Sequence, residues 1–193
     1  DECGECGGDN SGFTAEWSIT LETNINGWGT FLESDLQNYI GMNLNASDGY
    51  DSEYDIPEPP PNPGNYISLY FPHPEWNHDL GNNFTTDIRA LNDYSDSYML
   101  WDGEIVSNMS GNADITLTDF SNVPEAYSVF IYIEEQYYEL ENGEVANIAF
   151  FQENTPKPFQ LLVGGNIIIG CSDETACNYN LGTTVDDGSC EYA

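Results

Sequence analysis

The stretch YSVFIYIEE at residues 127–135 decides the fold, because its side chains alternate between two faces. Val129, Ile131 and Ile133 fall on one face, and the aromatic residues between them fall on the other. This two-residue period, carried by β-branched and aromatic side chains, is typical of a strand with one face in a core.

Comparable runs occur along most of the chain, separated by the Gly, Asn, Asp and Pro residues that break strands. They are WSITL (17–21), YISLYF (66–71), SYMLWDG (97–103), ADITLTDF (113–120), VANIAFF (145–151), FQLLVGG (159–165) and NIIIG (166–170). The residues expected to point inward include Trp17, Ile19, Leu21, Ile67, Leu69, Phe71, Ile115 and Leu117. Many short strands predict an all-β fold, a β-sandwich of immunoglobulin-like or jelly-roll-like type.

One segment, LESDLQNYIG at 32–41, also fits a helix. Its apolar residues recur at helical spacing and Gly41 is suited to a helix end; they are Leu32, Leu36, Tyr39 and Ile40. A strand fits the same residues, so both alternatives stay open.

The 193 residues are 39% hydrophobic and 13% aromatic, which is enough for a core. The length allows one domain with small appendages or two small domains. We divide the chain into a Cys- and Gly-rich segment at 1–12, the β-sandwich at 13–170, and an acidic Cys-rich segment at 171–193.

The charge balance limits the partners. There are 34 Asp and Glu residues against two basic residues, Arg89 and Lys157, for a formal charge of −32. Nucleic-acid phosphates and anionic membranes would be repelled, because binding them needs Lys and Arg. No apolar run is long enough to span a membrane, so no membrane insertion is expected. Such a surface favours either bound cations or a solvated acidic coat.

All five cysteines lie near the two ends: Cys3, Cys6, Cys171, Cys177 and Cys190. Their position predicts disulfide-stapled terminal segments and an extracellular or cell-surface setting. The number is odd, so one thiol is left for another chain or a flanking segment. A zinc site at Cys3 and Cys6 is the alternative, although no His lies near either end. The pairing stays open.

Two acidic stretches are candidate Ca²⁺ sites, because clustered carboxylate oxygens are what this ion prefers. The candidate ligands are Asp48, Asp51, Glu53 and Asp55 in the first stretch and Asp173, Asp186, Asp187 and Glu191 in the second. The alternative is that these acids cap turns without a metal.

No nucleophile elbow, HExxH motif or phosphate loop is present, so the protein is not predicted to be an enzyme. The segment HPEWNH (73–78) fits either a metal clasp of two imidazoles or a surface loop with Trp76 tucked against the sheet. If aromatic rings bind a polysaccharide, Trp28 and Trp76 are the candidates. Candidate glycosylation sites are Asn45, Asn83 and Asn108.

The segment GCSDETACNYNLGTTVDDGSCEY (170–192) closely resembles a short cysteine repeat of large secreted and cell-surface proteins from Bacteroidetes-like and other aquatic bacteria. DECGECGGDNS (1–11) resembles a segment that stands beside those repeats. The middle is similar to an uncharacterised acidic β-rich module, in ASDGYDSEYDIPEPP (46–60), YISLYFPHPEW (66–76) and FTTDIRA (84–90). The resemblance implies an extracellular location and a modular architecture, but no activity.

In that family the CEY segment precedes a DECG segment, so the resemblance implies that one unit's end meets the next unit's beginning. The sequence therefore predicts a structural protein that self-associates head to tail into a fibre or surface array, with Ca²⁺ at acidic loops. Its partner is then either a copy of itself or a flanking module of the same polypeptide. The alternative is a carbohydrate-binding or adhesion module of a larger secreted protein.

Overall fold

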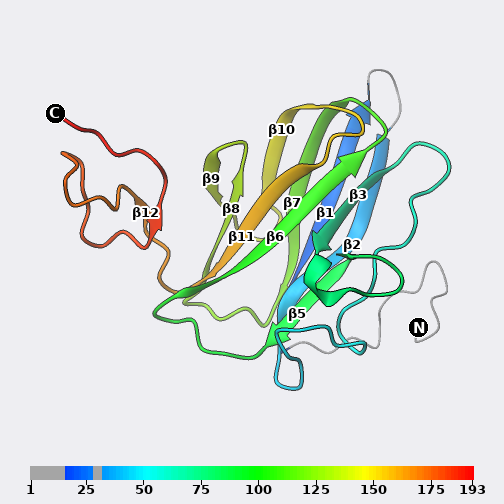
Figure 1. Ribbon diagram of the computed structural model, residues 1–193, viewed down its shortest axis with the longest axis horizontal. Helices are drawn as coiled ribbons and strands as arrows, with labels where there is room; N and C mark the ends of the chain where they lie inside the picture. Colours follow the sequence, from blue (N-terminus) through cyan, green and yellow to red (C-terminus); the bar gives the residue numbers. More distant parts are fainter. Residues whose placement is uncertain (1–15, 28–31) are drawn as a thin grey trace.

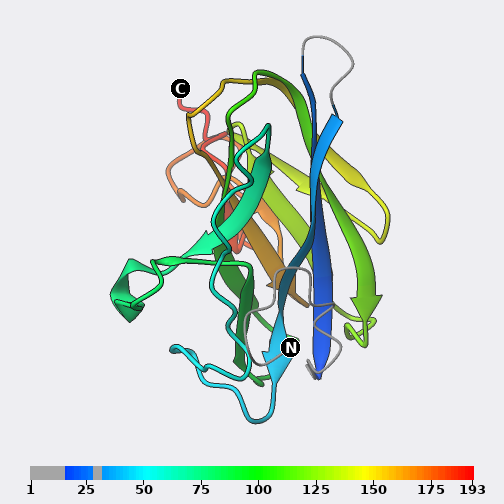
Figure 2. The same ribbon diagram turned by 90° about the vertical axis from the view of Figure 1, so that its right-hand side faces the viewer.

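The computed structural model describes residues 16–27 and 32–193. In this part of the chain two β-sheets stack face to face, as Figures 1 and 2 show, and no α-helix is present. The first sheet has the order β10-β7-β1-β2-β5 and the second the order β4-β3-β6-β11-β8-β9. The prediction of an all-β sandwich is confirmed.

The first sheet consists of β1 (Trp17–Gly27), β2 (Leu32–Asn43), β5 (Thr86–Ala90), β7 (Gly111–Ser121) and β10 (Val145–Phe151). The second consists of β3 (Ile67–Pro72), β4 (Asn83–Phe84), β6 (Tyr98–Ser107), β8 (Ser128–Ile133), β9 (Gln136–Glu139) and β11 (Lys157–Gly164). Neighbouring strands pair antiparallel in both sheets, except that β5 runs parallel to β2. A short 3₁₀ turn, η1 (Pro74–Trp76), follows β3.

The core lies between the two sheets and is built from the inward faces of their strands. Trp17 of β1 meets Trp101 of β6 edge to face, with ring centroids 5.8 Å apart, so the pair joins the sheets. The residues expected to point inward are buried: Trp17, Ile19, Leu21, Ile67, Leu69, Phe71, Ile115, Leu117, Val129, Ile131 and Ile133. Alternation in the sequence therefore identified the core faces correctly.

The helical alternative for residues 32–41 is wrong, because this segment is strand β2 between β1 and β5. Ile40 points into the core, whereas Leu36 is 49% exposed, so its apolar residues do not form one buried stripe. Gly41 does not cap a helix: a Cβ there would lie 2.3 Å from the Trp17 carbonyl oxygen of the neighbouring strand. Pairing with distant strands outweighs the local spacing.

The chain beyond β11 forms a separate small region, residues 169–193, which we call the C-terminal unit. Its only regular element is a two-residue parallel ladder between β12 (Ile169–Gly170) and β13 (Val185–Asp186). Of the run at 166–170, Ile169 and Gly170 belong to this unit, Ile168 accepts hydrogen bonds from it, and no residue lies in a sandwich sheet. Figure 1 shows the unit on the side of the sandwich where β8 and β9 lie.

Candidate functional site

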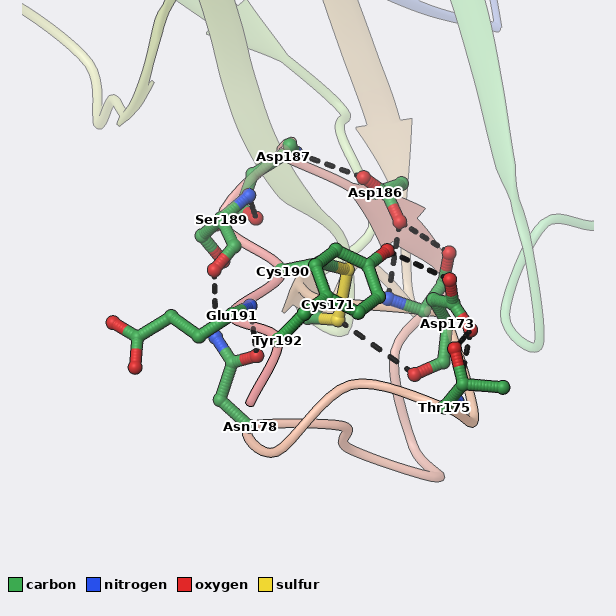
Figure 3. The surroundings of a disulfide bond; sticks show 12 residues. Cys171, Asp173, Thr175, Asn178, Asp186, Asp187, Ser189, Cys190, Glu191 and Tyr192 are labelled. Atoms are coloured by element: carbon green, nitrogen blue, oxygen red, sulfur yellow. Dashed lines mark hydrogen bonds between the residues drawn. A yellow bond between two sulfur atoms is a disulfide. The ribbon is translucent and has the colours of Figure 1, made fainter.

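The C-terminal unit is closed by a disulfide between Cys171 and Cys190, which are 19 positions apart (Figure 3). Its buried apolar side chains are few and small, namely Cys171, Ala176 and Val185. So little apolar area cannot hold a unit of this length together, and cross-linking of the chain replaces part of what a core would supply.

Asp186 binds two separate turns of the unit. One of its carboxylate oxygens accepts the N–H of Ser172 at 3.0 Å and also the hydroxyl of that residue. The other accepts the N–H of Gly188 at 2.8 Å, in a turn where Gly188 has a φ of 72°. The Ser172 hydroxyl, followed by these N–H groups, holds the pKa of Asp186 below its usual range.

Asp173 binds a turn and the end of the chain in a similar way. It accepts the N–H and the hydroxyl of Thr175 at 2.8 Å each, and the phenol of Tyr192 at 2.7 Å. The Tyr192 hydrogen bond, and then those of Thr175, lower the pKa of Asp173. Both acids therefore organise turns as hydrogen-bond acceptors.

Asn178 joins the loop that carries Cys177 to the segment that carries Cys190. Its amide nitrogen donates to the Ser189 carbonyl at 2.7 Å, and its amide oxygen accepts the Glu191 N–H at 2.8 Å. The Cys177 N–H also donates to the Glu191 carbonyl at 2.7 Å. Sequence reasoning included Asn178 in the repeat motif but did not predict this clamp.

The unit also carries groups that face solvent. Cys177 is exposed and its thiol is free, whereas Cys171 and Cys190 are paired. Leu181 is 85% exposed and Tyr192 is 62% exposed. Cys3 and Cys6 lie outside the described residues. The prediction of a disulfide-stapled segment is confirmed for the C-terminal segment.

The candidate Ca²⁺ ligands of the unit are only partly brought together. Asp173 and Asp186 lie close enough for the charge of Asp173 to act on the pKa of Asp186, in the direction that raises it. Figure 3 shows the Glu191 carboxylate pointing away from both, and Asp187 accepts the Ser189 N–H at 2.9 Å. Within residues 16–27 and 32–193, no three His, Cys, Asp or Glu side chains are grouped to hold a metal ion. Ca²⁺ binding stays a prediction.

The acidic loop at 48–55 lies along the outer edge of β5. Asp55 is 1% exposed and accepts the N–H of Ile88 at 3.1 Å, and Asp48 accepts the N–H of Ala90 at 3.3 Å. Asp51 accepts the Ser47 N–H, and Glu53 is exposed. Burial, partly offset by hydrogen bonds, raises the pKa of Asp55 to about 7. Asp55 and Asp48 therefore accept the β5 N–H groups that an open strand edge would offer to another chain.

Trp76 belongs to an aromatic cluster beside η1. Its ring stacks on His73 with centroids 3.6 Å apart and also meets Phe84 at 4.7 Å. The two ring nitrogens of His73 lie 2.7 Å from Glu75 and 2.9 Å from Asp87. His73 is thus already bound on both nitrogens, and Trp76 is half-buried as the surface-loop interpretation expects. The other candidate sugar platform, Trp28, lies outside the described residues.

Sequence reasoning missed a buried charge cluster around Asp87 of β5. Arg89 donates two hydrogen bonds to the Asp87 carboxylate, at 2.9 and 2.8 Å, and lies over the Trp101 ring at 5.0 Å. Burial opposes ionisation of Asp87, but His73 and Arg89 together hold its pKa below its usual range. The available signal was the i, i+2 spacing of Asp87 and Arg89, which places both on one strand face.

The candidate glycosylation sites differ in access. Asn45 is exposed, and Asn83 is half-buried in β4. The Asn108 amide accepts the Tyr66 N–H and donates to the Gly64 carbonyl, both at 3.0 Å. Asn45 is therefore the best placed of the three to carry a glycan.

Comparison of the chain with protein-family models, curated proteins and solved structures finds no match. The resemblance to the bacterial cysteine repeat stays a prediction. In the described part of the chain, no helix is long and apolar enough to cross a membrane.

Proposed function

We propose that the protein is an extracellular structural module that joins head to tail with further copies of itself. The observation that carries the proposal is the exposed free thiol of Cys177, held on a disulfide-closed unit beside the sandwich. A free cysteine beside a formed disulfide, in an oxidising setting, is a candidate for pairing with another chain. Head-to-tail pairing would use Cys3 or Cys6 of the next copy. The two thiols would lose two protons and two electrons to an oxidant such as dioxygen.

The edges of the sandwich also bear on where the joint lies. The N–H groups of Ile88 and Ala90 at the β5 edge are taken by Asp55 and Asp48, which disfavours addition of a strand there. At the other sheet, the Glu58 N–H donates to the carbonyl of Asn83 in β4, and Pro57 pairs with Phe84, so these residues cover the β4 edge. A joint through the C-terminal unit is therefore more consistent with the fold than a joint through β5.

The test combines non-reducing gel electrophoresis with negative-stain electron microscopy of the purified, air-oxidised protein in millimolar Ca²⁺. We expect a ladder of cross-linked multimers and regular filaments for the wild type, and the loss of both for Cys177→Ser. Glu174→Gln, an exposed substitution in the same unit, is the matched control and should assemble normally.

Cross-linked dimers alone would contradict the proposal, because a thiol that pairs with its own copy closes the assembly. Single particles in all conditions would also contradict it. An EDTA arm separates the ion from the joint: filaments that persist in EDTA keep the assembly and remove Ca²⁺ from it.

The second candidate function is a carbohydrate-binding or adhesion module. The observation that favours it is a hollow on the outer face of the second sheet, where polar and aromatic side chains line up across neighbouring strands.

A further inference from the structure

The outer face of β3, β6, β11 and β8 carries a hollow of about 440 Å³. Its lining includes Asp102, Glu104, Tyr132 and Gln160. None of the residues that line it is basic. Its volume is in the range of small-molecule sites.

The strand register places several of these residues in one row. Gln160 of β11 lies directly between Asp102 of β6 and Tyr132 of β8, and Tyr132 lies opposite Tyr137 of β9. Four adjacent strands at a spacing of about 4.8 Å give a row roughly 14 Å long. A row of this length fits an oligosaccharide segment better than a single sugar.

The polar members of the hollow are already oriented. The Gln160 amide donates to one oxygen of Asp102 at 2.7 Å, and the Tyr70 phenol donates to one oxygen of Glu104 at 2.8 Å. Each bond holds a carboxylate in place and leaves its second oxygen without a further partner among the described residues. Carboxylates fixed in this way are strong acceptors for hydroxyl groups.

The aromatic members form a platform at one end of the row. The Tyr132 and Tyr137 rings have centroids 4.5 Å apart and are tilted by 39°. Both are half-buried, so part of each ring still faces solvent. A ring held by its neighbour presents an apolar face at little cost in conformational entropy, which suits the C–H face of a sugar ring.

Charge selects among the ligands that such a row could take. The formal charge of −32, with two carboxylates inside the hollow, would repel uronic acids, sulfated glycans and phosphates. A cationic peptide would be attracted to the acidic surface in general and would not need the aromatic row. A neutral polysaccharide uses both the acceptors and the platform.

We propose that the outer face of β6, β11, β8 and β9 binds a neutral polysaccharide. Asp102, Glu104 and the Gln160 carbonyl accept its hydroxyl hydrogens, and Tyr132 stacks on a sugar ring. The inference deepens the carbohydrate-binding alternative and rests on it, and it does not depend on self-association. The site differs from the one that the sequence predicts at Trp28 and Trp76.

The test is affinity gel electrophoresis of the whole protein through gels that contain one soluble polysaccharide each. The neutral probes are galactomannan, xyloglucan, yeast mannan, laminarin and hydroxyethylcellulose. Polygalacturonate and poly-lysine serve as anionic and cationic probes. We expect retardation by at least one neutral probe, and none by polygalacturonate.

Two variants address the hollow. Asp102→Asn removes a charge-assisted acceptor while keeping the shape, and Tyr132→Ala removes the platform; each should weaken retardation by about tenfold or more in Kd. The matched control is Tyr138→Ala, because Tyr138 is a neighbouring exposed tyrosine of β9 that does not line the hollow. Unfolding curves of all variants confirm that each is folded.

Each outcome decides the proposal. Retardation that is lost in both hollow variants and kept in Tyr138→Ala supports it. Retardation kept in both hollow variants but lost in Trp76→Ala overturns this site and leaves the carbohydrate-binding function standing. Retardation by poly-lysine alone identifies a cationic partner and overturns the ligand class. No retardation by any neutral probe overturns both the site and the carbohydrate-binding function, whatever the filament experiment shows.

Discussion

The sandwich and the C-terminal unit are held together by different interactions, although both are rich in acids. In the sandwich, side chains such as Trp101 and Ile131 are 0% exposed and the two sheets share one apolar core. In the C-terminal unit, a disulfide and the hydrogen bonds of Asp173 and Asp186 connect the turns in place of a core. Acidic residues therefore have different structural roles in the two regions.

The difference shows in the pKa directions. In the sandwich, burial raises the pKa of Asp55 to about 7 and that of Glu58 to about 8, because these acids lie where their charge is poorly solvated. In the C-terminal unit, Asp173 and Asp186 have lowered pKa values, because hydrogen bonds favour their charged forms. Ionisation of Asp55 and Glu58 therefore destabilises the folded sandwich. Ionisation of Asp173 and Asp186 stabilises the folded C-terminal unit.

The largest expected effect comes from the sandwich core. Trp101→Ala should lower the free energy of unfolding by about 3–5 kcal/mol, through the cavity it leaves and the lost contact with Trp17. The Trp101 indole N–H also donates to the Asp87 carbonyl at 3.2 Å, and this hydrogen bond would be lost. Urea unfolding followed by circular dichroism measures the change.

Leu181→Ala is the control for this comparison, since Leu181 is 85% exposed in the C-terminal unit and its removal should change the free energy of unfolding by less than about 0.5 kcal/mol. If Trp101→Ala abolishes folding, Ile131→Val gives a milder test, with an expected loss of about 1 kcal/mol. Equal effects at Trp101 and Leu181 would contradict the division between a packed and a stapled region.

The second prediction breaks the staple. The double variant Cys171→Ala/Cys190→Ala should destabilise the closed form of the C-terminal unit by about 3 kcal/mol, the chain-entropy value for a loop of this size. Amide hydrogen exchange at Ser172 and Gly188, which both donate to Asp186, should accelerate. The urea midpoint of the sandwich should stay the same, and a large fall in that midpoint would show that the two regions fold as one.

The third prediction uses pH to separate the two regions. The folded-state pKa of Glu58 is raised from 4.5 to about 8, so folding favours its protonated form. Its contribution is present at low pH and is lost as pH rises from about 4.5 to about 8. The stabilising contribution of Asp55 is likewise lost as pH rises toward about 7. Burial lowers the pKa of His73, but its partners Asp87 and Glu75 raise it more, so its contribution is also lost as pH rises.

Glu58→Gln keeps an acceptor for the Ser68 hydroxyl, which donates to Glu58 at 2.6 Å, and removes the titrating group. We expect the variant to be more stable than the wild type at pH 9 by about 1–2 kcal/mol, with the difference vanishing near pH 4. Thermal unfolding across this pH range measures it. Glu53→Gln, at an exposed acid of the same half of the chain, should leave the profile unchanged.

The strands could be predicted from the sequence because alternation reports which face is buried. It identified Val129, Ile131 and Ile133 without any knowledge of the partner strands. Alternation does not report which strands are neighbours, so the parallel pairing of β5 with β2 could not be foreseen. For residues 32–41 the local spacing was ambiguous, and only the pairing of β2 with β1 and β5 settles it.

The roles of the acids could not be predicted, because they depend on contacts between distant positions. The sequence places Asp55 among several acids in a turn-forming stretch. In the structure it is buried and accepts the N–H of Ile88, 33 positions away. The turn-capping alternative describes Asp173 and Asp186 well, but which backbone groups they bind follows only from the closed disulfide. The sequence contained the residue types and not their partners.

The smallest expected effect sharpens the comparison within the C-terminal unit itself. Tyr192→Phe removes the hydroxyl that donates to Asp173 at 2.7 Å, which is the largest single cause of the lowered pKa of that acid. The pKa of Asp173 should rise toward its ordinary value of 3.8, as carboxyl-carbon NMR titration would measure. Thr175→Val leaves the Thr175 N–H in place and removes only a hydroxyl, so its shift in the pKa of Asp173 should be smaller.

In the wild type the contribution of Asp173 to stability is present above its unfolded pKa and is lost as pH falls through the lowered folded value. Tyr192→Phe should therefore loosen the chain end mainly above pH 4, and the stability of the sandwich should not change. A shift in the sandwich pH profile instead would mean that the two regions are coupled. Asp187 and Asp186 of the unit already act on Tyr137 of the sandwich, whose pKa is raised mainly by burial.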